Sequence, residues 1–337
     1  MKAGQRSPRR LREAVWGLFR AGVASLLLAH APPSSATDPA PIDGRESLNA
    51  ILWMQTAHEY AFSTIQVYAS ATRALAGAGS LPSALADPDA PDPGPAAPPA
   101  IVLDLDETVL DTSRYGAGLV AAGRRHTEAA WTEWVTSAPA EPVAGALAFL
   151  RAARDQGYGI FYVTNRVCPD AGRPAAYPHP ACPQREATVA QARRLGLPGA
   201  EDPRAFLLRN DQDGWAGGDK SPRRRYLAGS NRVVMLLGDD LGDFLPRSQV
   251  SLLRDQRPPG LLVGAATDTS AAPWRGRFGS QWFLLPNPSY GSWEVALAAC
   301  EAPDKDSQAC YEARRRGKYG RLIPSAPPPP AVPIPPR

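Results

Sequence analysis

Two acidic side chains directly follow a short apolar run. Asp104 and Asp106 are two residues apart after Ile101-Val102-Leu103. One carboxylate of such a pair can attack phosphorus and form an aspartyl-phosphate. The other can give a proton to the leaving oxygen and later take one from water. A single Asp in this place could equally cap a helix, so the prediction depends on partners elsewhere in the chain.

Further polar residues occupy equivalent places. Thr164-Asn165-Arg166 and Gly238-Asp239-Asp240 each follow an apolar run, and Lys220-Ser221 stands at a predicted helix start between them. Ligands of open parallel sheets bind outside the carboxyl ends of the strands, so we expect these residues to converge. Carboxylates there can hold a hard cation such as Mg²⁺, while a lysine and a hydroxyl bind phosphoryl oxygens. The set therefore favours phosphoryl transfer.

The elements that position these residues alternate along the chain. Strands are predicted at 101–103, 160–163, 206–208 and 233–237, with a further candidate at 282–285. Helices are predicted at 145–156 and 183–195, and a basic helix is predicted after Lys220. This alternation indicates an α/β fold with a mostly parallel sheet.

Two segments precede this domain. Apolar residues at three- and four-residue spacing predict one long amphipathic helix from Leu48 to about Leu75, ended by Gly77 and Gly79. Residues 81–100 are rich in Pro, Ala and Asp, and their periodicity is too weak to indicate packing. They are predicted to form a linker or extended loop.

The first 36 residues have the pattern of an export signal. A basic stretch precedes an apolar segment that is strongest at 21–29, and Ser34-Ser35-Ala36 suits signal peptidase. Arg20 keeps the apolar run well short of the roughly 20 residues that a membrane span needs. We therefore predict a cleaved signal peptide at 1–36, a periplasmic or secreted protein, and no stable membrane anchor. Arg9-Arg10 leaves the twin-arginine route open beside the general one.

The net charge is concentrated in that leader. The chain carries +4, but residues 1–36 hold six basic residues and one acidic residue, which leaves 31 basic and 32 acidic residues. The remainder has no excess positive charge with which to bind a nucleic-acid polymer.

Four cysteines lie in the exported portion, where disulfides persist. They allow three connectivities. Closeness in sequence favours Cys168 with Cys182 and Cys300 with Cys310. A zinc site from Cys168, His179 and Cys182 is the alternative, although it lacks an evident fourth ligand.

The polar segments together resemble the four motifs of the haloacid dehalogenase superfamily. Within it they are most similar to the class C acid phosphatases, which include outer-membrane lipoprotein 5′-nucleotidases. The resemblance covers most of residues 47–300. It rests on "IVLDLDETVLD" (101–111), "FYVTNR" (161–166), "DKS" (219–221) and "GDDLGDF" (238–244), with support from "FLLPNPSYGSWE" (283–294) and "LWMQTAHEY" (52–60).

The resemblance implies a Rossmann-like parallel sheet flanked by helices, with a small helical subdomain. The phosphatase domain would span 101–316, with 37–80 contributing a helix to the subdomain. Residues 317–337 depart from the family pattern, and their many prolines predict a disordered tail. The implied activity is that of an exported Mg²⁺-dependent acid phosphatase acting on phosphomonoesters, with nucleoside 5′-monophosphates as the expected substrates. The sequence leaves the oligomeric state open, a homodimer included.

Carried over to this chain, the resemblance implies Asp104 as nucleophile and Asp106 as general acid and base. Mg²⁺ would bind the carboxylates of Asp104 and Asp239 and the backbone carbonyl of Asp106. Asp243 would be a further ligand or a support. Asp240, where relatives often have Asn, is not expected to bind the metal.

Other positions would bind the substrate. Thr164 and Lys220 would hold the phosphoryl group, with Asn165 nearby. In nucleotidase relatives two aromatic residues enclose the base, and the matching positions are Trp134 and Tyr290. Stacking would give affinity for any base. The alternative is that Trp134, three residues after Trp131, is an ordinary core aromatic.

Rival functions fit the sequence less well. "GWAGGDKS" (214–221) lacks the glycine before lysine that a P-loop needs, and no G-x-S-x-G elbow is present. The three histidines after the leader, His58, His126 and His179, lack the context of a histidine phosphatase. A non-catalytic binding or storage protein on the same fold remains the alternative, and measured turnover would distinguish it.

Overall fold

The computed structural model describes residues 44–137, 140–169, 182–255, 274–295, 297 and 308–321. The expected signal peptide, Cys300, His179 and most of the Pro-rich tail lie outside these ranges. Residues 317–320, expected in the tail, belong instead to helix α11 (Gln308–Gly320). No helix in the described ranges combines the length and apolar character needed to cross a membrane.

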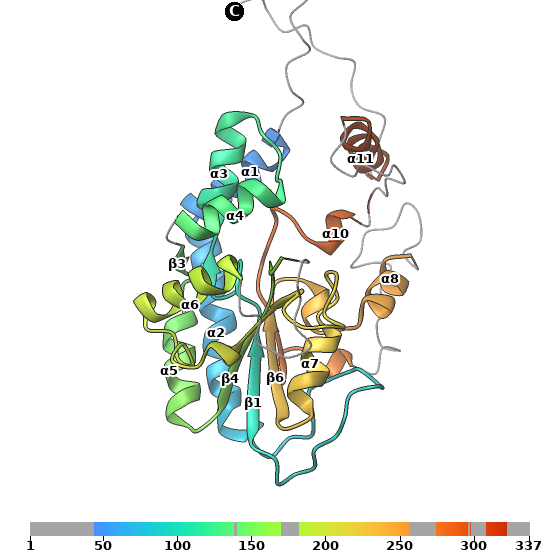
Figure 1. The fold of residues 1–337 in the computed structure, drawn as a ribbon. Helices are drawn as coiled ribbons and strands as arrows, with labels where there is room; N and C mark the ends of the chain where they lie inside the picture. Colours follow the sequence, from blue (N-terminus) through green and yellow to red (C-terminus); the bar gives the residue numbers. More distant parts are fainter. Residues whose placement is uncertain are drawn as a thin grey trace, which may run out of the picture. The chain divides into compact units, whose positions relative to one another are not determined.

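Five parallel strands form the central sheet (Figure 1), in the order β5-β4-β1-β6-β7. Their bounds are β1 Pro99–Leu103, β4 Gly159–Val167, β5 Phe206–Arg209, β6 Arg232–Gly238 and β7 Trp282–Leu284. All five strands predicted from the sequence are present. β1 is central, so the segment that follows it ends beside both β4 and β6.

Helices cover both faces of the sheet, which explains why its inner strands read as continuous apolar runs. Ile101 and Leu103 of β1 pack on one face, whereas Val102 packs on the other. The first face carries α2 (His58–Ala78), α5 (Ala146–Asp155) and α6 (Pro183–Leu195). The second carries α7 (Ser221–Ala228) and α8 (Arg247–Asp255).

A small helical subdomain is present, as expected. It contains α1 (Leu48–Thr56), α3 (Ser113–Ala122) and α4 (Glu128–Ser137). Ile51 and Met54 of α1 pack with Ala117 and Val120 of α3. A two-stranded antiparallel ladder, β2 (Leu110–Asp111) with β3 (Glu141–Pro142), joins the ends of the segment that holds α3 and α4.

The prediction of one long helix from Leu48 was wrong. The chain breaks at Ala57, whose backbone is extended (φ −86°, ψ 127°), and two helices result. The physical reason is that the two halves have different partners. α1 packs against α3 in the subdomain, whereas α2 packs against α5 on the sheet. Periodicity within one segment cannot reveal such a change of partner.

The segment expected to be a linker, 81–100, also differs. Pro99 and Ala100 already belong to β1, and the residues before them, although neither helix nor strand, are packed. Ala84 and Leu85 are buried in the second face, and the N–H of Ala84 donates to the Val233 carbonyl at 2.7 Å. Contacts with distant residues order this segment, so it needs no internal periodicity.

Candidate active site

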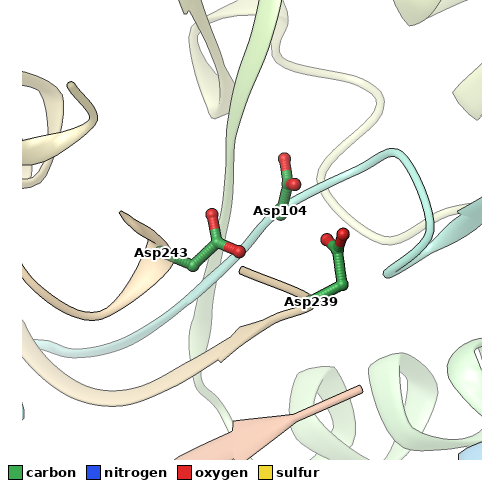
Figure 2. A group of neighbouring side chains, drawn as sticks. All are labelled: Asp104, Asp239 and Asp243. Atoms are coloured by element: carbon green, nitrogen blue, oxygen red, sulfur yellow. The ribbon is translucent and has the colours of Figure 1, made fainter. Parts of the chain in front are cut away.

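Three aspartates meet at the carboxyl ends of β1 and β6 (Figure 2). Asp104 follows β1 directly, Asp239 follows β6, and Asp243 ends the short 3₁₀ helix η3 (Leu241–Asp243). Carboxylate oxygens of the three lie within 4.8 Å of one another. A side chain at Gly238 would clash with Asp243, so the absence of a Cβ at that position permits the close approach.

The group carries more negative charge than its surroundings neutralise. Burial, together with the charges of Asp104 and Asp243, raises the pKa of Asp239 well above its usual range. Burial also raises the pKa of Asp104 to about 7, although Lys220 acts in the opposite direction. Three hard oxygen donors in a largely buried, electron-rich site fit a divalent cation such as Mg²⁺. The structure thus brings together the three carboxylates expected to bind metal.

Lys220 lies beside the expected nucleophile. Its Nζ is 2.6 Å from an Asp104 oxygen and 2.6 Å from an Asp243 oxygen. Burial lowers the pKa of Lys220, but the two carboxylates more than offset this and the pKa is raised. The lysine is therefore a fixed positive charge at the site, where it can also bind a phosphoryl oxygen.

Two neutral side chains orient Asp239. Thr108 Oγ1 donates to one carboxylate oxygen at 3.0 Å, and Asn287 Nδ2 donates to the other at 2.8 Å. The sequence reasoning assigned no role to either residue. A signal was present for Asn287, because the segment after β7 reaches the same edge of the sheet as the segments after β1 and β6.

Thr164 and Asn165 lie at the carboxyl end of β4, next to β1. Thr164 is buried and its hydroxyl accepts from the Arg166 N–H at 3.1 Å, whereas Asn165 is exposed. Arg223 of α7 holds both, because its guanidinium donates to the Thr164 carbonyl and, at 2.7 Å, to Asn165 Oδ1.

Arg224 holds the segment that carries Asp243. It donates to the carbonyls of Gly242, Asp243 and Leu245 at 2.8, 2.9 and 3.1 Å. The sequence predicted only a basic helix here. In the fold, Arg223 and Arg224 are both buried. Arg223 binds the segment with Thr164 and Asn165, and Arg224 binds the segment that contains Asp243.

The other acidic residues have separate partners. Asp106 forms an ion pair with Arg166, whose Nη2 lies 2.7 Å from Oδ1. Asp240 caps η3 and accepts from the N–H of Ser292 at 2.6 Å. Among the described residues, the cluster of carboxylates that could hold a metal consists of Asp104, Asp239 and Asp243 and does not include Asp240.

The two aromatic positions have different surroundings. Trp134 stacks on Trp131, with ring centroids 5.3 Å apart and planes inclined by 17°, and it also contacts Tyr115 and the core. Tyr290 is 44% exposed, and its hydroxyl donates to the buried carboxylate of Glu107. Glu107 thus joins Tyr290 to the segment that carries Asp104 and Asp106. Whether the pair encloses a base stays a prediction.

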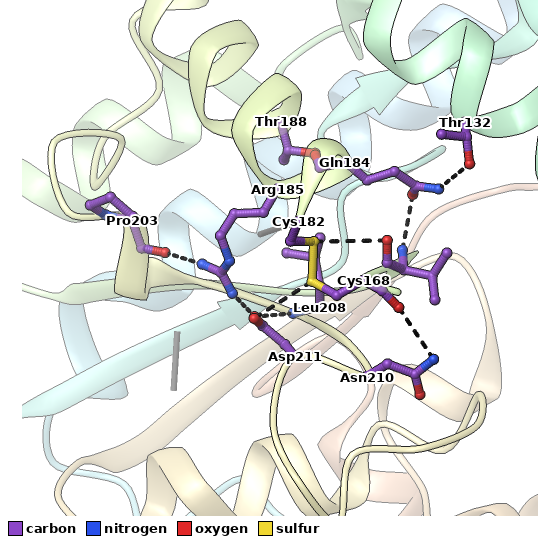
Figure 3. Close-up of a disulfide and its surroundings, with 11 residues drawn as sticks. Thr132, Cys168, Cys182, Gln184, Arg185, Thr188, Pro203, Leu208, Asn210 and Asp211 are labelled. Atoms are coloured by element: carbon purple, nitrogen blue, oxygen red, sulfur yellow. Dashed lines mark hydrogen bonds and ion pairs between the residues drawn. A yellow bond between two sulfur atoms is a disulfide. The ribbon is translucent and has the colours of Figure 1, made fainter. Parts of the chain in front are cut away.

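A disulfide joins Cys168, just after β4, to Cys182, just before α6 (Figure 3). This is one of the two expected bridges, and it replaces the alternative zinc site. Cys310 is also disulfide-bonded, and its expected partner Cys300 lies outside the described residues.

Comparison with known proteins gives a consistent result. Residues 35–293 match the sequence pattern of the HAD superfamily, subfamily IIIB (acid phosphatase). The fold is similar to that of the class C acid phosphatase from Bacillus anthracis, with 28% identity and a TM-score of 0.59, over 83% of this chain and 97% of that one. A structure of the same Bacillus anthracis enzyme with tungstate bound matches equally well.

The family match spans most of the chain and includes every residue of the aspartate group, and the five-stranded parallel sheet agrees with it. The protein therefore belongs to subfamily IIIB of the HAD superfamily, the acid phosphatases.

Proposed function

We propose that the protein is a Mg²⁺-dependent phosphomonoesterase that forms an aspartyl-phosphate on Asp104. The proposal rests on the position of Asp104. Its Oδ1 lies 2.6 Å from Lys220 Nζ, and its carboxylate belongs to a cluster with those of Asp239 and Asp243. A nucleophile at this point attacks a phosphoryl group whose oxygens are already next to positive charge.

The chain's residues divide the reaction between them. A carboxylate oxygen of Asp104 forms a bond to phosphorus while the ester P–O bond breaks. The electron pair of that bond goes to the ester oxygen, which takes a proton from Asp106. In the second half, water attacks phosphorus and gives its proton to Asp106, and Asp104 is released. Lys220 and Thr164 hold phosphoryl oxygens throughout, with Asn165 nearby.

Mg²⁺ would be held by Asp104, Asp239 and Asp243, with the backbone carbonyl of Asp106 as a further ligand. It would neutralise charge that develops on the phosphoryl oxygens. The cluster of three carboxylates fits this ion because every donor atom in it is a hard oxygen.

Replacement of Asp104 by Asn tests the proposal. The amide keeps the shape of the side chain but removes the nucleophile, so turnover of phosphomonoesters should fall by several orders of magnitude. Steady-state kinetics with and without Mg²⁺ measure the effect, and circular dichroism checks the fold. Near-normal turnover in the purified variant would contradict the mechanism. Wild-type protein that binds phosphate without turnover would favour a binding or storage protein.

The proposed substrates are nucleoside 5′-monophosphates. Tyr290 supports this, because its partly exposed ring is held by Glu107 near the segment that carries Asp104 and Asp106. Trp134 would be the second aromatic of the clamp. Stacking contributes about 1–3 kcal/mol per base without selecting among bases.

The variant Tyr290→Ala tests this specificity. We expect wild type to prefer a nucleoside monophosphate over a small aliphatic phosphate in kcat/KM, and the variant to lose that preference while it still hydrolyses the small substrate. Tyr226→Ala, which alters a half-exposed tyrosine of α7, is the control. Equal losses for both substrates would mean that Tyr290 is structural, and the proposal would retreat to a broad-specificity acid phosphatase.

The protein is proposed to act outside the cytoplasm. The disulfide between Cys168 and Cys182 supports this, because such bonds persist in oxidising compartments. The mature chain would begin near Thr37, which the intact mass of exported protein measures.

A further inference from the structure

We propose that Arg166 is a positioning residue that aims the proton-carrying oxygen of Asp106 at the leaving group. The inference rests on the role of Asp106 as general acid, proposed above. Arg166 itself does not need to contact the substrate for this role.

The two oxygens of Asp106 are held unequally. Oδ1 accepts from Arg166 Nη2 at 2.7 Å and from Nε at 3.2 Å, whereas Oδ2 has only the 3.2 Å contact with Nε. Oδ1 is therefore the anchored oxygen. Oδ2 is the oxygen that can carry a proton and leave the guanidinium without breaking the shorter contact.

The burial of the pair supports this division. The side chain of Arg166 is fully buried, whereas that of Asp106 keeps 14% of its surface exposed. A buried arginine cannot easily follow a moving carboxylate. The carboxylate can turn about its anchored oxygen, and its exposed side is where a substrate could approach.

Arg166 is itself fixed on two sides. Its remaining arm, Nη1, donates to Thr188 Oγ1 of α6 at 2.9 Å. The guanidinium carbon lies over the ring of Trp131 of α4, 5.9 Å from its centroid. Thr188 is almost completely buried and its hydroxyl donates to the Gln184 carbonyl at 2.6 Å, so it has a defined orientation.

Two hydrogen bonds and a disulfide connect the end of β4 to the helices that carry these partners (Figure 3). The N–H of Val167, next to Arg166, donates to Gln184 Oε1 at 2.9 Å, and Gln184 Nε2 donates to Thr132 of α4 at 2.8 Å. One residue further, Cys168 is bonded to Cys182 at the start of α6. The arginine that contacts the general acid therefore lies where β4, α6 and α4 are connected.

The consequence for chemistry is specific. When Asp104 attacks, the ester P–O bond breaks and its electrons go to the ester oxygen, which takes the proton from Asp106 Oδ2. Substrates with a poor leaving group need that proton during bond cleavage, whereas good leaving groups depart without it. Loss of the anchor should therefore penalise poor leaving groups selectively.

The experiment compares kcat/KM for an alkyl phosphate and for p-nitrophenyl phosphate, because kcat/KM includes the first P–O cleavage. General acid catalysis contributes on the order of 10²–10⁴-fold, so we expect Arg166→Met to lose about tenfold or more on the alkyl phosphate beyond its loss on the nitrophenyl ester. Arg166→Lys, which keeps one donor, should recover part of that difference. Thr188→Val keeps the arginine but removes the acceptor of its Nη1 group. This variant should show the same selective loss on the alkyl phosphate, with a smaller difference between the two substrates.

Three controls separate the outcomes. Asp106→Asn should give the same leaving-group selectivity; if it does not, the proposed role of Asp106 fails, and with it this inference. If Asp106→Asn is selective but the Arg166 and Thr188 variants lose both substrates equally, only the positioning role is overturned. Arg225→Lys, a change in an arginine whose partners are Asp87 and Asp89, should leave both substrates unchanged.

Inhibition by inorganic phosphate tests whether Arg166 binds the phosphoryl group directly. A positioning residue leaves the inhibition constant within a few-fold of wild type. An Arg166 that grips the phosphoryl group would weaken phosphate inhibition and raise KM for every substrate alike, and that result would overturn the proposal. Because Thr188→Val retains the arginine, the test holds even if the Arg166 variants fail to fold.

Discussion

At the scale of single residues, Asn287 shows how a neutral side chain can orient a carboxylate of the candidate metal site. Its amide donates to Asp239 Oδ2, while its own Oδ1 accepts from the N–H of Ser289 at 2.9 Å. Both ends of the amide are thus used, which fixes its orientation. Such partners of metal-binding carboxylates set the direction of the lone pairs that face the ion.

We expect Asn287→Ala to raise the Mg²⁺ concentration for half-maximal activity by about tenfold or more, because Asp239 loses one of its two hydrogen-bond donors. A Mg²⁺ titration of phosphatase activity measures the change. Asn231→Ala is the matched control, because Asn231 lies before β6, at the opposite end of the strand from Asp239, and its side-chain amide donates to the Leu227 carbonyl and the Ser230 hydroxyl. An unchanged Mg²⁺ requirement would show that Asn287 does not support the metal site.

At the scale of elements, the end of β4 is joined to the start of α6 by more than packing. The strand continues through Thr164, Asn165 and Arg166, and its pairing with β5 is irregular between Val163 and Val167, where it resumes with Arg209. The disulfide closes a segment with a sequence separation of 14. A cross-link of that size restricts the unfolded chain, which stabilises the folded state.

The double variant Cys168→Ala/Cys182→Ala should therefore lower the free energy of unfolding by about 3 kcal/mol. Denaturant-induced unfolding without reductant measures this, with wild type as reference and the bond at Cys310 left intact. We also expect lower turnover, because Arg166 and its neighbours in β4 lose the covalent connection to α6 that the disulfide provides. A denaturation midpoint equal to that of wild type would contradict the expected stabilisation.

At the scale of the whole molecule, the crowded carboxylates oppose folding unless something neutralises them. The pKa of Asp104 is about 7 in the metal-free fold, whereas an unperturbed Asp has a pKa of about 3.9. Between these values the folded state binds more protons than the unfolded state. By linkage, the contribution of Asp104 to stability is present below the lower pKa and is lost as the pH rises through the higher one. The raised pKa of Asp239 acts in the same direction.

Metal-free protein should thus lose thermal stability as the pH rises from about 4 to about 7. Melting temperatures in the presence of a chelator, measured across this range, test the sign. Added Mg²⁺ should raise the melting temperature most at the upper end, where the carboxylates are ionised. Asp104→Asn should flatten the profile. A metal-free melting temperature that rises steadily with pH in both proteins would contradict this account.

Many of the residues that meet in the candidate site could be predicted from the sequence because they depend on local pattern. Asp104 and Asp239 lie directly after buried parallel strands, and the carboxyl ends of such strands meet at one edge of the sheet. Lys220 lies at the start of α7, the helix that follows β5. An apolar run and the polar residues after it are contiguous in the chain, so these features are visible before folding.

Tertiary structure alone decided which side chains form hydrogen bonds to the acidic residues of the site. Arg166 and Asp106 are 60 positions apart, and Asn287 is 48 positions from Asp239. The break at Ala57 and the burial of Ala84 likewise follow from distant partners. A hydrogen bond or a packing contact depends on distance in space, and periodicity records only which face of an element is apolar. The sequence therefore determined the chemistry of the site, whereas the fold decided how that chemistry is held in place.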